Sequence, residues 1–177
     1  MSVRLVLVRH GLSSFNEKGL IQGRTDDSFL TETGIKQAEE AGKALSGISF
    51  HAIYSSPLVR AAETAKTIQK RLHQSININY DKNLLEVDLG SWSGLKLNEI
   101  KNKYPEIYRI WKDDPEHLTL KKSNDTFYKP IKELYDQANI FIQNILKLYL
   151  ERDEANILII GHNAILRCLI LLLIGKP

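Results

Sequence analysis

Two histidines with a neighbouring glycine lie far apart in the sequence, in Arg9-His10-Gly11 and in Gly161-His162-Asn163. Each follows a run of mostly apolar residues, at 3–8 and at 156–160, and such runs predict buried parallel strands. Residues 3–8 are expected to form a central strand that is buried on both faces. Because ligands of open α/β sheets bind at the carboxyl ends of the strands, both histidines are expected at the same edge of the sheet. We therefore interpret this edge as a functional site.

The position of Arg60 points to an anion at the same site. Arg60 falls in the first turn of a helix that we expect at 57–72, with Ser56 as its cap and Pro57 at its first position. A cation is mildly unfavourable at a helix N-terminus, unless an anion binds at the same end. Arg9 supplies a second guanidinium, and the planar geometry of this group suits phosphate oxygens.

Phosphoryl transfer is a chemistry that uses all of these residue types. A histidine can attack phosphorus, arginines can neutralise the phosphoryl charge without Mg²⁺, and a carboxylic acid can protonate the leaving alkoxide. Glu86 and Asp88 are both candidates for that acid, and the residue pattern alone does not choose between them.

A series of short motifs runs through nearly the whole chain. The motifs are Leu7-Val8-Arg9-His10-Gly11 with Ser13 and Asn16, Gln22-Gly23, Leu30-Thr31 with Gly34, Ser55-Ser56-Pro57 with Arg60 and Thr64, Glu86 with Gly90, Trp92 and Gly94, and Gly161-His162. In type and order they resemble the histidine phosphatase superfamily, the phosphoglycerate mutase-like proteins. This resemblance implies an α/β fold, a three-layer α/β/α sandwich with a mostly parallel central sheet.

The resemblance also implies a role for each side chain of the site. His10 would be the nucleophile that forms a phosphohistidine, and Glu86 would be the proton donor and then the base that activates water. The residues that would bind the phosphoryl group or the substrate are Arg9, Ser13, Asn16, Gln22, Gly23, Arg60, His162 and Asn163. Asn163 stands where relatives commonly carry glycine, and it would either contact the phosphate or cap the last helix. We expect the arginines to lower the pKa of His10, because they disfavour a second positive charge.

Three functions use such a site. We favour a phosphatase that hydrolyses phosphomonoesters of small metabolites. The alternatives are a phosphoglycerate mutase that depends on a 2,3-bisphosphoglycerate primer, and a non-catalytic module that binds phosphorylated ligands. Family mutases tend to carry a longer segment between the acid and the second histidine than the 75 residues, 87–161, of this chain. The binding module is the least favoured function, because no catalytic residue of the family is missing.

Length and composition set the remaining expectations. The 177 residues suit one domain, 1–177, although relatives generally continue beyond its last residue into another strand. The net charge of +3 gives no reason to expect a nucleic acid, and the apolar run 168–174 is too short to span a membrane. The single cysteine, Cys168, favours the cytoplasm and excludes an intrachain disulfide. We expect a small phosphorylated metabolite as partner and neither a metal nor a cofactor; the oligomeric state is open, with a homodimer among the options.

Apolar periodicity predicts the elements that must position the site. The expected helices are 32–45 with Thr31 as cap, 57–72, 96–103, 106–112, 129–151 and one after Asn163. The expected strands are 3–8, 51–54, 76–80 and 156–160. Residues 12–30 and 81–94 are expected to be irregular, and 113–125 carry no clear pattern. His51, His73 and His117 are interpreted as structural or exposed.

Overall fold

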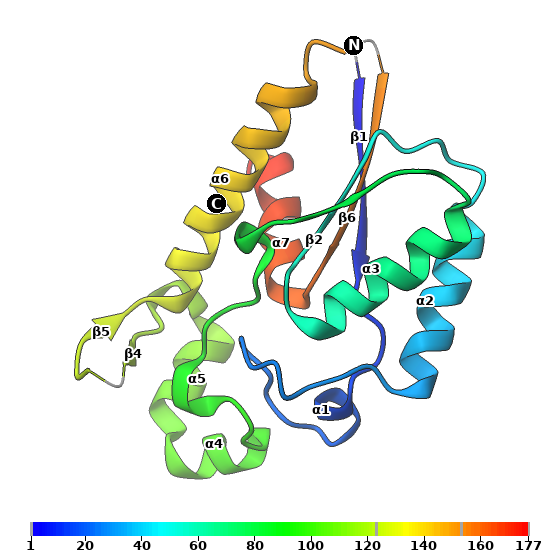
Figure 1. Ribbon diagram of the computed structural model, residues 1–177. Coiled ribbons are helices and arrows are strands. Elements are labelled where there is room, and N and C mark those ends of the chain that lie inside the picture. Colours follow the sequence, from blue (N-terminus) through cyan, green and yellow to red (C-terminus); the bar gives the residue numbers. More distant parts are fainter. Residues whose placement is uncertain (1, 123, 153, 177) are drawn as a thin grey trace.

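A four-stranded sheet lies between two layers of helices in the computed structural model, which describes residues 2–122, 124–152 and 154–176 (Figure 1). All strand pairs of this sheet are parallel, in the order β1-β6-β2-β3. The strands are β1 (Ser2–Arg9), β2 (Ala52–Ser55), β3 (Ile78–Tyr80) and β6 (Glu154–Gly161). The register pairs Arg9 with Gly161, so that His10 and His162 follow two neighbouring strand ends. The predicted meeting of the two histidines is confirmed.

Helices cover both faces of the sheet. On one face lie α2 (Glu32–Leu45) and α3 (Val59–Leu72), and on the other lie α6 (Pro130–Tyr149) and α7 (Asn163–Leu173) (Figure 1). Alternate residues of β6 enter the two cores: Ile157 and Ile159 pack with α6 and α7, and Leu158 and Ile160 with α2 and α3. This two-sided burial is typical of a central parallel strand. The expected three-layer α/β/α sandwich is therefore confirmed.

The strand β1 corrects one expectation, because within the described chain it forms an edge of the sheet and pairs with β6 alone. Its apolar residues are only partly buried, although they pack on both faces: Leu5 and Leu7 on the side of α6 and α7, and Val6 and Val8 on the other. Packing on two faces makes the sequence of an edge strand look like that of a central strand. The central position belongs to β6.

Short elements complete the fold, and most of them lie beyond the carboxyl end of β1 (Figure 1). They are the helix α1 (Ser14–Glu17), the 3-10 turns η1 (Lys82–Leu84), η2 (Gly90–Trp92) and η3 (Pro115–His117), the helices α4 (Leu97–Lys103) and α5 (Pro105–Asp113), and the antiparallel pair β4 (Leu120–Lys121) and β5 (Phe127–Tyr128). The stretch 12–30, expected to be irregular, thus contains one turn of helix. Position 123 of the unassigned stretch 113–125 lies outside the described residues. None of the described helices is long and apolar enough to cross a membrane.

Two helix starts can be compared with their predictions. The helix α2 has the predicted bounds, and the Thr31 hydroxyl accepts the Gly34 N–H at 3.0 Å, as a cap does. The helix α3 begins at Val59, two residues after Pro57, and its N-cap residue, Leu58, has no capping side chain. Instead, a carboxylate from a distant loop, Asp26 Oδ1, accepts the Val59 N–H at 2.9 Å. The sequence pattern did not reveal this contact.

Two glycines let the chain after β1 lie directly on α2. A Cβ atom added to Gly11 would overlap the Gly34 carbonyl group, and one added to Gly34 would overlap the Leu12 carbonyl group. Gly11 is therefore required for a close approach of two backbones, and its backbone does not adopt a left-handed conformation. The contact fixes where the loop after His10 leaves the sheet.

We expect Gly34→Ala to lower the free energy of unfolding by about 2–3 kcal/mol, because the new methyl group must displace backbone atoms. This loss would occur although alanine is favoured over glycine inside a helix by about 1 kcal/mol. The control is Gly47→Ala, at which an added Cβ meets no atom within 4 Å, and which should change stability by less than about 0.5 kcal/mol. Urea unfolding followed by circular dichroism measures both. Wild-type stability in Gly34→Ala would contradict the close approach.

Candidate active site

A cavity of about 680 Å³ opens at the carboxyl ends of β1 and β6. It is lined by most of the residues that the sequence predicted for the site, namely Arg9, His10, Asn16, Gln22, Gly23, Arg60, Glu86 and Asn163. His162 lies directly behind this wall, with its ring centroid 5.1 Å from that of His10. The structure therefore brings together residues from four separate parts of the sequence.

The hydrogen bond of the His10 ring determines which of its nitrogens can react. Nδ1 lies 2.8 Å from the Gly11 carbonyl oxygen, which can only accept a hydrogen bond. Nδ1 must therefore carry the proton of the neutral ring, and Nε2 keeps its lone pair. The side chain is only 6% exposed and lines the cavity. A neutral His10 thus has a nucleophilic Nε2.

The environment of His10 keeps it neutral. Burial is the largest cause that lowers its pKa, from 6.5 to about 4, and the positive charges of Arg60 and Arg9 act in the same direction. The hydrogen bond to Gly11 opposes them. The expected direction is confirmed, but the expected cause was incomplete, since desolvation outweighs the two arginines.

The second histidine is fixed by a buried serine. His162 is 1% exposed, and its Nε2 lies 2.8 Å from the Ser56 hydroxyl, which accepts the Leu58 N–H. Among the described residues, Nε2 is the hydroxyl's sole acceptor, so Nδ1 carries the ring proton. Burial, followed by the charges of Arg60 and the neighbouring His10, holds the pKa of His162 well below 6.5. Nδ1 is buried and has no hydrogen-bond partner in the described part of the chain.

Arg60 is a fully buried cation. Its Nη1 donates to the Thr25 carbonyl oxygen at 2.8 Å and its Nη2 to that of Gly23 at 2.9 Å, whereas Nε has no partner among the described residues. Burial lowers the pKa of Arg60, and the negative charges of Glu86 and Asp26 oppose this shift. A guanidinium stays charged in proteins, so the site contains a permanent positive charge whose Nε–H is free to donate to a ligand.

Glu86 occupies the N-terminus of α7. Its Oε1 accepts the N–H groups of Val87 at 2.9 Å and Ile165 at 3.3 Å, and its Oε2 accepts that of Ala164 at 3.2 Å. A carboxylate at a helix N-terminus is favoured by the free N–H groups and the helix dipole. Glu86, and not Asn163, therefore caps the last helix, which corrects one of the two roles expected for Asn163. The side chain of Asn163 is exposed and lines the cavity.

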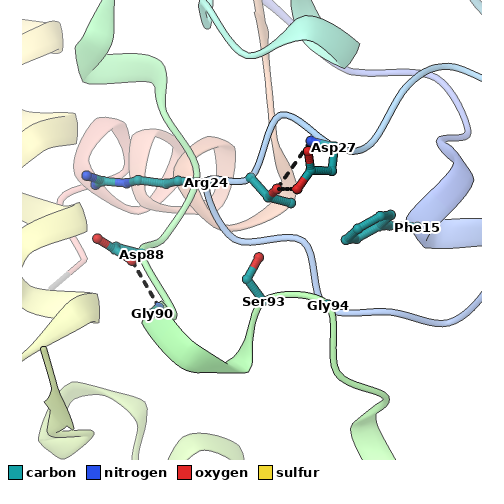
Figure 2. Close-up of a pocket in the computed structure, with 8 residues that line it drawn as sticks. Phe15, Arg24, Asp27, Asp88, Gly90, Ser93 and Gly94 are labelled. Atoms are coloured by element: carbon teal, nitrogen blue, oxygen red, sulfur yellow. Dashed lines mark hydrogen bonds between the residues drawn. The ribbon is translucent and has the colours of Figure 1, made fainter. Parts of the chain in front are cut away.

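Asp88 lies on the other side of the same loop. It lines a separate surface hollow of about 340 Å³, together with Phe15, Arg24 and Ser93, and its carboxylate accepts the Gly90 N–H at 3.0 Å (Figure 2). This hollow does not include His10. Of the two acids that the sequence left open, the structure places Glu86 in the cavity with His10.

Arg24 and Gln137 position Glu86, and sequence analysis missed both. Arg24 Nε donates to the Glu86 carbonyl oxygen at 2.9 Å, and its Nη2 donates to Gln137 Oε1 at 2.9 Å. The Ser93 hydroxyl joins the same two loops by donating to the Gln22 carbonyl oxygen at 2.6 Å. These partners are distant in the sequence and belong to no local pattern, so no sequence signal could have identified them.

Ser13 was expected at the cavity wall but lies behind it. Its side chain is completely buried, and its hydroxyl lies 3.0 Å from Asn16 Oδ1 and 2.8 Å from Gln22 Oε1. It therefore orients two residues that line the cavity and does not itself line it.

The two site histidines do not belong to any group of three potential metal ligands in residues 2–122, 124–152 and 154–176. The group found there consists of Asp114, Glu116 and His117, which are exposed on and beside η3. His51 and His73 are also exposed, in agreement with their interpretation.

The model of the histidine phosphatase superfamily (branch 1) matches residues 5–177, and the chain belongs to this family. It is 36% identical to 2-carboxy-D-arabinitol-1-phosphatase of Triticum aestivum over 172 residues. This match covers 97% of this chain and 32% of that protein. Phosphoserine phosphatase 1 of Hydrogenobacter thermophilus is 30% identical over 173 residues, or 98% of this chain and 77% of that protein. The alpha-ribazole phosphatase structure from Shigella flexneri superposes with a TM-score of 0.82 at 28% identity, over 98% of this chain and 81% of that chain. A 2,3-bisphosphoglycerate-dependent phosphoglycerate mutase of Thermoplasma acidophilum matches 55% of this chain.

These comparisons confirm the family that the motifs indicated. The chain spans about a third of the length of the plant relative and about four fifths of the Shigella structure. Both phosphatases and mutases occur among the relatives.

We expect the His10 ring to titrate at about pH 4 and to carry its proton on Nδ1 at every pH above this value. Because burial and the nearby arginines oppose a charged ring, His10 takes up its second proton only as the pH falls through this lowered pKa. A pH titration of ¹⁵N-labelled protein by NMR measures both properties, with His10→Asn used to assign the signal. Titration near pH 6.5, or a proton on Nε2 at neutral pH, would contradict the geometry.

Proposed function

We propose that the protein is a phosphatase that hydrolyses phosphomonoesters of small metabolites through a phosphohistidine on His10. The observation that supports it most directly is a neutral nucleophile beside two buried donors, Arg60 Nε and His162 Nδ1, which have no partner in the part of the chain that the structure describes. Unsatisfied buried donors cost free energy, and a ligand with several acceptor oxygens removes that cost. A phosphoryl group provides such oxygens, together with a negative charge that Arg9 and Arg60 would neutralise.

In the first step, His10 Nε2 would form a bond to phosphorus while the ester P–O bond breaks. The leaving oxygen would take a proton from Glu86. In the second step, water would attack phosphorus as the N–P bond breaks, and Glu86 would take back the water proton. The net result is the conversion of an ester and water into an alcohol and phosphate.

Glu86 fits the role of acid and base better than Asp88, because it lines the cavity with His10. In the structure its two oxygens accept three backbone N–H groups, which fix the carboxylate at the start of α7, next to His162. A bound phosphate dianion close to Glu86 would favour the proton uptake that the first step needs.

The proposed chemistry needs no metal, because two arginines can supply the positive charge that stabilises the transferring group. We also propose a cytoplasmic location, on the ground that the one cysteine, Cys168, is a free thiol.

A mutase that uses a 2,3-bisphosphoglycerate primer is the second candidate, since it would use the same phosphohistidine but pass the group to a hydroxyl. Conversion of 3-phosphoglycerate to 2-phosphoglycerate, measured beside phosphate release, separates the two. A non-catalytic binding module would show neither activity.

We expect Glu86→Gln to lower kcat/KM for glycerol phosphate about 100-fold or more, because the alkoxide then leaves without a proton. The loss for p-nitrophenyl phosphate should be much smaller, since its leaving group needs little protonation. Phosphate release from the two esters measures the difference. The matched control is Asp88→Asn, which removes a charge on the same loop outside the cavity and should affect both esters alike and weakly. A leaving-group dependence in Asp88→Asn instead would overturn the assignment of Glu86.

A further inference from the structure

Two cations that the motifs did not single out, Lys112 of α5 and Arg167 of α7, line the same cavity as His10. On α7 the lining residues are Asn163, Ala164, Arg167, Cys168 and Leu171. Their spacing places them on one face of the helix. Arg167 is therefore four residues, or about 6 Å along the helix axis, beyond Asn163 and hence beyond the phosphoryl site beside His162.

Neither cation has a carboxylate partner within the described ranges. The ion pairs found there use other basic residues, namely Arg71, Arg109, His117, Lys121, Lys122 and Lys132. Lys112 and Arg167 are both exposed in the structure. They are thus accessible to a ligand in the cavity.

The charges that line the cavity are not balanced by a phosphomonoester alone. Four cations line it, Arg9, Arg60, Lys112 and Arg167, against one carboxylate, that of Glu86. A phosphate dianion beside His10 would balance Arg9 and Arg60. One positive charge would remain, or two while Glu86 carries the proton that it donates. A second anionic group on the substrate would balance this excess of positive charge.

Apolar side chains line the same cavity. They include Ile21, Val87, Leu89, Trp111, Ile131 and Leu171. Ion pairs are stronger next to apolar walls than in open water, because the local dielectric constant is lower. The volume of about 680 Å³ lies in the usual range for small-molecule sites.

We propose that Lys112 and Arg167 form a second anion site, and that the substrate is a small phosphomonoester with a second anionic group, either a carboxylate or another phosphate. This inference rests on the proposed function, because it takes the first phosphate to lie beside His10.

The test uses isothermal titration calorimetry on the His10→Ala protein, which lacks the nucleophile and is expected to bind esters without turning them over. The first pair of ligands is 3-phosphoglycerate and glycerol 1-phosphate, which differ by a carboxylate in place of a hydroxymethyl group. The second pair is fructose 1,6-bisphosphate and fructose 6-phosphate, which differ by one phosphate. We expect a preference of about tenfold or more for the ligand with two anionic groups in at least one pair. The pair with the larger preference identifies the second group.

Arg167→Gln and Lys112→Gln, each added to this protein, should reduce that preference about five- to tenfold. The matched control is Arg109→Gln, which removes a positive charge from α5 at a position outside the cavity and should leave the preference unchanged. Thermal unfolding of each variant confirms that it is folded.

The outcomes separate the two proposals. Equal affinity within both ligand pairs, or a preference that survives both substitutions, would overturn the second anion site and leave the proposed function intact. Failure of the folded protein to bind any of the four esters would contradict the proposed function itself.

Discussion

The parallel pairing of β1 with β6 is the constraint on which the site depends. The ladder pairs Arg9 with Gly161 and continues by one further bond, from the His10 N–H to the Gly161 carbonyl oxygen at 3.0 Å. Two segments about 150 residues apart thereby deliver their histidines to one place. After this point the strands diverge: β1 leads into the loop that lies on α2, and β6 leads into α7, whose N-terminus holds Glu86. A shift of register by one residue would separate the nucleophile from its neighbour and turn it to the other face.

Burial of the polar groups of the site costs free energy, and hydrogen bonds within the protein compensate only part of this cost. The Arg60 guanidinium has two carbonyl acceptors, and one nitrogen of His162 contacts Ser56. Arg60 Nε and the other His162 nitrogen have no partner within the described ranges. Thr64 links this group to the nucleophile, because its hydroxyl accepts the Gly11 N–H and donates to the Arg60 carbonyl oxygen. Among the described residues, the buried side-chain atoms without a partner are Arg60 Nε, His162 Nδ1 and Asn156 Oδ1. The first two lie at the site and are donors that a phosphoryl group would use.

Local sequence patterns predicted the helices and strands well, but they did not predict which side chains contact distant parts of the chain. The bounds of α2 follow from its apolar spacing and its Thr31 cap, both of which are local. The apolar pattern of β1 predicted its packing on two faces but not its place at the edge, because an apolar pattern does not record which strands are its hydrogen-bond neighbours. Ser56 has the sequence position of a helix cap, and only the approach of β6 shows that it contacts His162.

The residues that connect the loops around the active site could not be predicted from the sequence, because their contacts are also between distant segments. Arg24 joins Glu86 to Gln137, and Asp26 reaches the start of α3, across separations that no periodicity encodes. Most of the residues that the motifs identified for the site nevertheless line the cavity, and several of them, such as His10 and Asn163, lie shortly after a predicted strand. Lys112 and Arg167 became visible only once α5 and α7 were seen to share that cavity.

The most direct test of this account is the trapping of the covalent intermediate. The wild-type protein is mixed with ³²P-labelled p-nitrophenyl phosphate, quenched in alkali after milliseconds to seconds, and mapped by mass spectrometry. The account predicts an acid-labile phosphoryl group on Nε2 of His10, absent from His10→Ala and retained in His117→Ala, a variant at an exposed histidine. Label that resists acid, or that persists in His10→Ala, would contradict it.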